Sequence, residues 1–101
     1  MPVVKNKYRD EWEPGDVDIM RPGPYGNLWR VGPDGTRKQV LDRYETWLMA
    51  PENHEYRDMV RRQLRGRNLT CCCKPQPCHG DLLMKVANSK NDAELGIIAR
   101  P

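Results

Sequence analysis

All four cysteines of this 101-residue chain lie within one short segment, residues 71–78, and His79 follows directly. A disulfide framework spaces its cysteines widely so that they can join distant loops, which this cluster cannot do. The cysteines therefore indicate a local site and not a set of staples, and hydrophobic residues must supply the core. That core has to be small, because hydrophobic residues make up 38% of the chain and phenylalanine is absent.

The length supports one core, so we expect a single domain over residues 1–101. No apolar run approaches the ~18 residues that a membrane span needs. No basic segment followed by an apolar one opens the chain, as a secretory signal would. We therefore expect a cytoplasmic protein without membrane contact. The formal net charge of +3 permits contact with nucleic acid but does not demand it.

The pattern of apolar residues and of helix and turn signals predicts strands and helices in alternation. Thr36 and Gln39 have the spacing of a capping box, and Gly66 is placed to end a helix. The predicted elements are a strand or arm over 1–15, a strand over 16–20, a brief strand over 28–31, helices over 36–50 and 52–65, a strand over 69–73, a helix over 80–89, and a tail over 90–101 that docks as an edge strand or stays mobile.

This order indicates a small α/β layer in which the cysteine-rich strand is central and leads into the last helix. Ligands collect beyond the carboxyl ends of the strands in such folds. Two loops follow predicted strands, 21–27, which is rich in proline and glycine, and 73–79. If their strands are parallel neighbours, the two loops face one pocket.

Cys78 is the best candidate for a reactive thiolate. It stands at the start of the predicted last helix, where backbone amides and the helix dipole lower the pKa of a thiol. The adjacent His79 is suited to act as an acid, a base or an orienting group.

Two other interpretations of the cluster remain open. Cys71, Cys73, Cys78 and His79 offer three sulfurs and one nitrogen, an acceptable tetrahedral set for zinc, although the spacing differs from that of a zinc ribbon. Buried cysteines also behave as small hydrophobic residues, so Cys71 or Cys72 can simply pack in the core.

Basic residues suggest two further sites. Arg57, Arg61 and Arg65 share one ridge of the second helix, which could meet phosphates but is more often only a solvated face. Arg21 and Arg37 flank the glycine- and proline-rich loop and are suited to hold an anion with two hydrogen bonds each.

Two motifs and the middle helix resemble one family, the domain of unknown function 4326, small proteins of bacteria and their phages. The motifs are Arg21-Pro22-Gly23-Pro24-Tyr25-Gly26-Asn27 and Cys71-Cys72-Cys73-Lys74-Pro75-Gln76-Pro77-Cys78-His79-Gly80-Asp81. The resemblance covers about residues 17–88 and includes Tyr44 and Trp47-Leu48. Two positions depart from the family pattern, since Cys72 replaces a tryptophan and Leu28 a proline. The resemblance implies that the site residues are Arg21, Gly26, Asn27, Cys71, Cys73, Cys78, His79, Gly80 and Asp81.

Together these observations favour one pocket that binds or modifies a nucleotide- or nucleobase-type ligand. Cys78 would be the thiolate or a metal ligand and His79 the acid/base or a second ligand, with Asp81 beside them. Arg21 and Arg37 would hold an anionic group, and Gly26 and Asn27 would shape the loop and orient the ligand.

The alternative is a non-enzymatic module in which Cys71, Cys73, Cys78 and His79 hold a structural zinc. In that case the helix carrying Arg57, Arg61 and Arg65 would contact a host protein or nucleic acid. A third possibility, a DNA-binding protein, predicts an affinity that falls steeply with salt.

Overall fold

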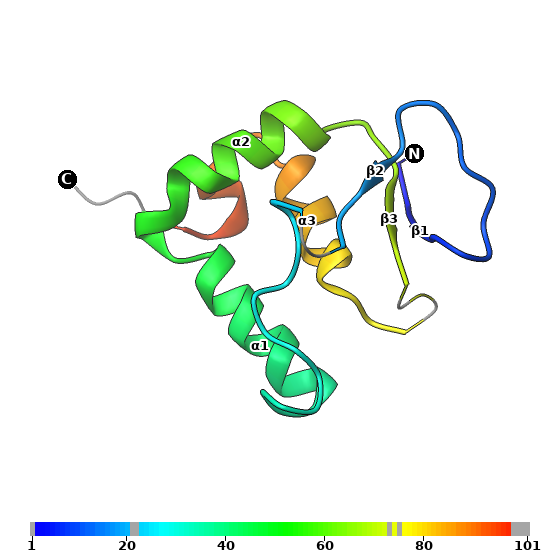
Figure 1. The fold of residues 1–101 in the computed structure, drawn as a ribbon. Coiled ribbons are helices and arrows are strands. Elements are labelled where there is room, and N and C mark those ends of the chain that lie inside the picture. The colour runs from blue at the N-terminus through cyan, green and yellow to red at the C-terminus, as the bar shows by residue number, and fades with distance from the viewer. Residues whose placement is uncertain (1, 21–22, 73, 75, 98–101) are drawn as a thin grey trace.

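In the part of the chain that the structure describes, three strands form one parallel sheet (Figure 1). The structure, a computed structural model, describes residues 2–20, 23–72, 74 and 76–97. The strands are β1 (Val4–Asn6), β2 (Val17–Asp18) and β3 (Leu69–Cys71), in the order β1-β3-β2. Leu69 is the register partner of both Val4 and Val17. The α/β prediction and the central place of the cysteine-rich strand are confirmed.

The predicted strand over 28–31 is wrong. The Trp29 amide donates to Asn27 Oδ1 at 2.9 Å, and the Arg30 amide donates to Asp34 Oδ2 at 2.8 Å. Nearby side chains thus take the backbone donors that a neighbouring strand would need, because Asn and Asp compete with regular structure for local amides. The segment is therefore a shaped loop.

Helix α1 (Arg37–Leu48) begins at the predicted capping box. The Gln39 amide donates to Thr36 Oγ1 at 3.2 Å, and the Thr36 amide donates to Gln39 Oε1 at 2.9 Å. This reciprocal pair satisfies two amides that the helix start leaves without intrahelical partners. One face of α1 is buried through Val40, Tyr44 and Leu48.

Helix α2 (His54–Leu64) follows a short 3-10 turn, η1 (Pro51–Asn53), and ends before Gly66, whose φ is +76°. A left-handed φ of this kind favours glycine, as the sequence predicted. Inward residues of the helix include Val60 and Leu64, both fully buried.

The arginine ridge of α2 is not a solvated face, and that expectation is wrong for two of its three members. The Arg57 side chain is 0% exposed and Arg61 is 9% exposed. Arg57 donates to the carbonyls of Leu48 and Ala50 at 2.8 and 2.6 Å. Both guanidiniums also bind Asp92. The ridge therefore ties α2 to the end of α1 and to the C-terminal segment.

Helix α3 (His79–Ala87) packs against the sheet, α1 and α2. Beyond it, the tail forms a 3-10 turn, η2 (Asp92–Leu95), instead of an edge strand, and Leu95 packs against the core. The last part of the predicted tail, residues 98–101, lies outside the described residues. Among the helices of the described ranges, none is long and apolar enough to cross a membrane.

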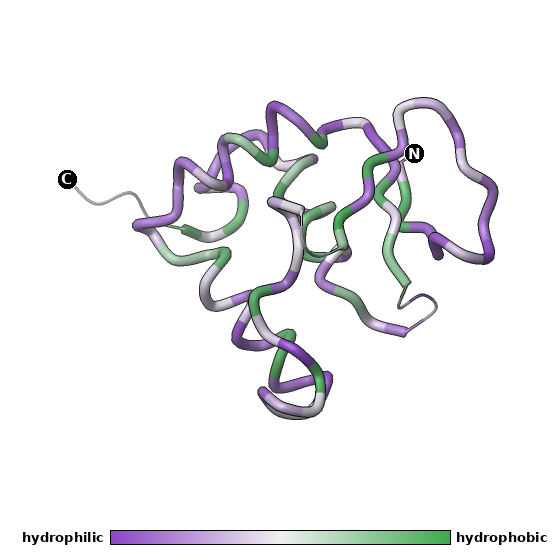
Figure 2. The backbone as a smooth tube through the Cα atoms, in the orientation of Figure 1, coloured by the Kyte–Doolittle hydropathy of each residue, from purple (hydrophilic) through white to green (hydrophobic). Residues whose placement is uncertain are grey.

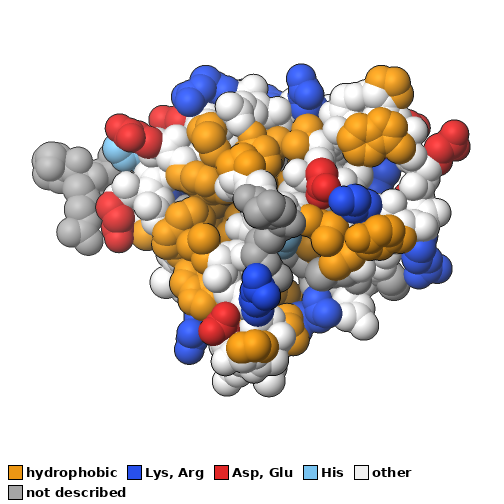
Figure 3. Space-filling view, viewed as in Figure 1, with side chains coloured by type: hydrophobic (Ala, Val, Ile, Leu, Met, Phe, Trp, Pro, Cys, Tyr) orange, Lys and Arg blue, Asp and Glu red, His pale blue; other side chains and the backbone are white. Residues whose placement is uncertain are grey.

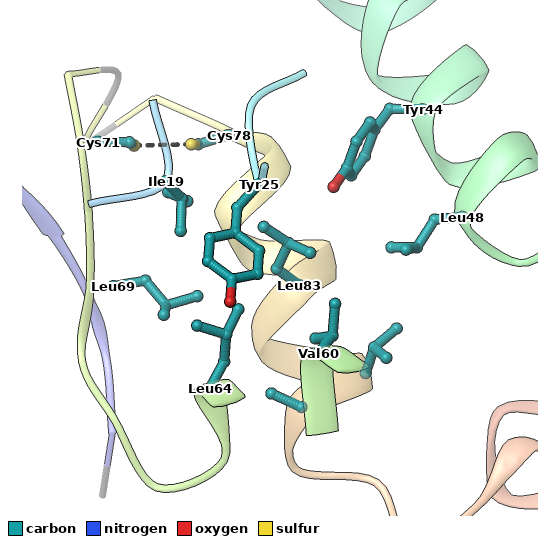
Figure 4. Packing of buried hydrophobic residues seen from close by; sticks show 12 residues of the cluster. Ile19, Tyr25, Tyr44, Leu48, Val60, Leu64, Leu69, Cys71, Cys78 and Leu83 are labelled. Atoms are coloured by element: carbon teal, nitrogen blue, oxygen red, sulfur yellow. Dashed lines mark hydrogen bonds between the residues drawn. The ribbon is translucent and has the colours of Figure 1, made fainter. Parts of the chain in front are cut away.

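The hydrophobic core lies between the sheet and the three helices (Figure 4). The strands and α3 carry much of its apolar sequence, whereas the loop after β1 is largely hydrophilic (Figure 2). Ile19, Leu69 and Leu83 are fully buried there. The core therefore fixes the carboxyl ends of β2 and β3 and the start of α3 relative to one another.

Candidate functional site

A pocket of about 180 Å³ lies at the carboxyl ends of β2 and β3. The two strands are parallel neighbours, so the segment after β2 and the segment after β3 meet there beside the first turns of α1. The segment after β2 crosses the face seen in Figure 3, where hydrophobic side chains gather. The pocket is lined by Met20, Asn27, Trp29, Val31, Arg37, Val40, Leu41, Cys71, Cys72, Cys78 and His79.

Among the described residues, five of the predicted site residues line this pocket, and they come from four separate parts of the chain. These are Asn27, Arg37, Cys71, Cys78 and His79. Of the other predicted site residues, Gly26, Gly80 and Asp81 are described by the structure but do not line the pocket. The predicted roles of Arg21 and Cys73 lie outside the described residues.

Cys78 is the N-cap residue of α3, and its sulfur accepts from the Gly80 amide at 3.3 Å. Such an amide at a helix start favours negative charge on the sulfur. Asp81 completes a capping box, because its Oδ2 accepts from the Cys78 amide at 3.2 Å. Its other oxygen pairs with Lys74. The structure thus gives Asp81 the role of holding the helix start.

His79 is 8% exposed and anchored through its Nε2 atom. Nε2 donates to the carbonyls of Ile19 and Tyr25, at 2.9 and 3.1 Å. Because carbonyl oxygens can only accept, Nε2 carries the proton, and in the neutral imidazole Nδ1 is then the acceptor. Nδ1 lies 3.7 Å from Cys78 Sγ, so the ring faces the thiol with its basic nitrogen.

Tyr44 supports the imidazole from the side of α1. Its ring meets the His79 ring edge-on, with the ring centroids 5.4 Å apart. Burial raises the pKa of the Tyr44 hydroxyl, so this neighbour stays neutral. The imidazole is therefore fixed by two carbonyls and one aromatic ring, which leaves little freedom for its orientation.

The sulfurs of Cys71 and Cys78 point toward one another at a distance of 2.7 Å (Figure 4). Both residues are buried, whereas Cys72 is exposed. Among the described residues, which leave out Cys73, no group of three or more His, Cys, Asp and Glu side chains is arranged to hold a metal ion.

Arg37 and Asn27 line the pocket together with the cysteines. Arg37 Nη1 donates to the carbonyl of Pro77 at 3.2 Å and so ties the start of α1 to the loop before Cys78. Asn27 is 8% exposed, and its Oδ1 accepts from the Trp29 amide, which fixes the plane of its side-chain amide.

Sequence reasoning missed the apolar walls of the pocket. Met20, Trp29 and Val31 supply one wall, and Val40 and Leu41 of α1 supply another. These residues belong to three predicted elements, and no motif joins them. Gly80, which the resemblance placed in the site, instead lies against Ile19 and Val4, where a side chain has no room.

The comparisons with known proteins agree with the resemblance seen in the sequence. The family described as Domain of unknown function (DUF4326) matches residues 3–89, so the match also includes β1. A similar protein, the "Uncharacterized 12.4 kDa protein in nrdA-td intergenic region" of Enterobacteria phage T4, is 34% identical over 87 residues. That alignment covers 84% of this chain and 76% of the phage protein. No solved structure matches the chain.

Proposed function

The chain belongs to the family described as Domain of unknown function (DUF4326), and we propose that its pocket binds a nucleobase-type ligand beside the Cys78–His79 pair. One observation carries the proposal: Asn27, Arg37 and the Cys78–His79 pair surround a single, mostly apolar pocket. Apolar walls with a few convergent polar groups are typical of small-molecule sites.

The size and walls of the pocket favour one planar ring system. Its volume of about 180 Å³ is smaller than the roughly 300–1,000 Å³ of sites for drug-sized ligands. A nucleobase has apolar faces and polar edges. Trp29 offers a stacking surface, and such stacking contributes about 1–3 kcal/mol per base. The fixed amide of Asn27 is suited to hydrogen-bond a base edge.

Arg37 extends the proposal from a base to a nucleotide. Its guanidinium lines the pocket and is held near the loop before Cys78 by the Pro77 carbonyl. A guanidinium in this position is suited to bind a phosphate or another anionic group. We expect the phosphate to lie outside the small pocket, with the base inside.

The Cys78–His79 pair offers the pocket a nucleophile and a proton acceptor. Cys78 is suited to act as a nucleophile, because the Gly80 amide stabilises negative charge on its sulfur. His79 Nδ1 is suited to accept the thiol proton. These two groups would serve a reaction on the bound ring. The cytoplasm, where nucleobases and nucleotides are used, is the corresponding location.

Titration calorimetry on the reduced, full-length chain tests the proposal with free bases, nucleosides and nucleoside monophosphates as probes. We expect at least one of these compounds to bind. Leu41→Trp, which fills the pocket, should abolish that binding, and Arg37→Gln should weaken the monophosphate more than the nucleoside. Arg43→Gln is the matched control, because it removes the same charge from the same helix outside this pocket. If no probe binds, or if Leu41→Trp binds as wild type does, the proposal is wrong.

A zinc-binding module is the second candidate, favoured by the meeting of the Cys71 and Cys78 sulfurs beside His79 Nδ1. Metal-binding histidines commonly donate their other N–H to a backbone carbonyl, as His79 does. Cys73 would be the remaining ligand. Elemental analysis of protein purified without added zinc would then find about one ion per chain, and chelation would unfold the domain. A folded protein without metal contradicts this candidate.

In the zinc candidate, the surface for a host protein or nucleic acid was expected on α2. Arg57 and Arg61 are enclosed, so a partner could meet them only after their bonds to Asp92 open. Arg65 is exposed at the end of the helix, but its Nε donates to the Ala87 carbonyl at 2.9 Å. A partner contact through this helix would therefore compete with internal hydrogen bonds.

A further inference from the structure

Two sulfur atoms from separate elements meet at the base of the pocket. Cys71 ends β3, and Cys78 caps α3. Their Sγ atoms are 2.7 Å apart and point toward one another (Figure 4). This separation is longer than the ~2.05 Å of a disulfide bond, and neither cysteine is in a disulfide, so the two sulfurs are in direct non-bonded contact. We propose that they form a dithiol site that a peroxide oxidises to a disulfide.

The positions of both cysteines are fixed by other contacts, so the approach of the sulfurs does not depend on a bond between them. β3 is paired with a strand on each side. The start of α3 is held by the Cys78–Asp81 capping box and by the two hydrogen bonds from His79 Nε2. Disulfide formation therefore needs only a small shift of two side chains.

Cys78 is the thiol that we expect to react with the oxidant. Both cysteines line the pocket, which is wide enough for a molecule as small as hydrogen peroxide, and the Cys78 sulfur accepts from the Gly80 amide at the start of α3. The Gly80 amide and the start of α3 favour its thiolate form, and the thiolate is the form that reacts with peroxides. Cys71, at 2.7 Å, is then the resolving thiol.

The reaction has two steps and needs no further reactant. In the first step the Cys78 thiolate attacks one oxygen of the peroxide, the O–O bond breaks, hydroxide leaves and a sulfenic acid forms. In the second step the Cys71 sulfur attacks the Cys78 sulfur, the S–O bond breaks, and the departing hydroxide takes the Cys71 proton to form water. The cysteines together lose two electrons, and the peroxide gains them.

The disulfide would also lower the affinity of the pocket for a base. This part of the proposal rests on the proposed function. Oxidation removes the Cys78 thiolate from the site and ties it to Cys71, so the sulfur can neither contact nor attack a bound base. We expect the oxidised protein to bind the base at least about ten-fold more weakly than the reduced protein, which corresponds to about 1.4 kcal/mol.

Peptide mapping by mass spectrometry after stoichiometric hydrogen peroxide tests the dithiol site on the wild-type chain, so the result does not depend on a variant that folds. We expect one Cys71–Cys78 disulfide, reversed by dithiothreitol. Cys71→Ser should instead leave a sulfenic acid at Cys78, detected with a dimedone probe. Cys72→Ser is the matched control, because this neighbour is exposed, and it should form the disulfide as wild type does.

The outcomes separate this proposal from the proposed function. A disulfide through Cys72 or Cys73, or oxidation of Cys78 to a sulfinic acid without any disulfide, overturns the dithiol site. An unchanged affinity for the base after oxidation overturns the predicted loss of affinity. If the reduced protein binds no base while the Cys71–Cys78 disulfide still forms, the proposed function fails and the dithiol site stands.

Discussion

Arg57 of α2 and Asp92 of η2 form a bidentate ion pair. Arg57 Nε donates to Asp92 Oδ1 at 3.0 Å, and Nη2 donates to Oδ2 at 2.8 Å. Arg61 adds a third bond to the same carboxylate at 2.7 Å. One acidic residue of the C-terminal segment therefore binds two arginines that α2 keeps from solvent, and Arg61 has a second ion pair with Asp58.

Asp92→Asn should lower the free energy of unfolding by about 3 kcal/mol, because it leaves the enclosed Arg57 without a counter-charge and leaves Arg61 with only the half-exposed Asp58. Urea denaturation near neutral pH measures this change. The control is Asp42→Asn, the same substitution in the exposed Lys38–Asp42 pair, which should cost less than about 0.5 kcal/mol. If Asp92→Asn and Asp42→Asn lowered the free energy of unfolding by the same small amount, the buried ion pairs of Asp92 would not stabilise the fold.

The stability difference between wild type and Asp92→Asn should shrink in acid. Hydrogen bonds from Arg57, with further help from Arg61, lower the pKa of Asp92 from 3.8 to about 2. A lowered pKa in the folded state stabilises the protein above about pH 4, and this contribution is lost as the pH falls toward about 2. Urea midpoints at about pH 5 and pH 2.5 measure the trend. A constant difference between the two proteins would contradict it.

The parts of the fold that depend on neighbouring residues were predictable from the sequence. Thr36 and Gln39 define the start of α1 by a contact within one turn. The start of α3 was likewise predictable from nearby residues. The helix begins at His79, one residue earlier than predicted, with Cys78 as its N-cap.

The arginine ridge was misjudged because its explanation is not local. Asp92 lies far along the chain from Arg57, and nothing in the helical periodicity of α2 indicates that pairing. The loop at 28–31 was misjudged for a different reason. Its apolar residues suit a strand, but Asn27 and Asp34 occupy the backbone amides that a strand would use.

The candidate site was partly predictable. Motifs indicated Asn27, Cys78 and His79, which meet because β2 and β3 are parallel neighbours. The apolar walls needed the three-dimensional arrangement, since Leu41 of α1 and Trp29 of the loop share no sequence pattern. The approach of Cys71 to Cys78 also depends on how the segment between them turns back.

Gly80→Ala should destabilise the protein by about 1 kcal/mol. A Cβ atom there would lie 2.6 Å from Ile19 Cδ1 and 3.0 Å from Val4 Cγ1, and overpacking commonly costs about 1–3 kcal/mol. Helix propensity alone predicts the opposite sign, a gain of about 1 kcal/mol. Thermal unfolding distinguishes the two, with Lys85→Ala on the exposed side of α3 as a control. A more stable Gly80→Ala protein would show that packing at this point is loose.

Thr70→Val should raise the stability by about 1 kcal/mol. Thr70 is 3% exposed in β3, and within the described part of the chain its hydroxyl has no hydrogen-bond partner. A buried hydroxyl without a partner is costly, and valine has nearly the same shape and suits a strand. Denaturant unfolding measures the gain. Thr46→Val, where the exposed hydroxyl donates to the Asp42 carbonyl, should give none. A loss at Thr70 would mean that its hydroxyl is satisfied.

Locating a bound base on the protein tests directly whether the pocket beside Cys78 and His79 is the binding site. We would record amide and indole spectra of the reduced, isotope-labelled chain while adding the base that binds in calorimetry. We expect the largest shifts at Asn27, the Trp29 indole, Cys72 and His79, and we expect Leu41→Trp to abolish them. Shifts confined to the groove around Trp47 and Asn53, or no shifts at saturating base, would contradict this expectation.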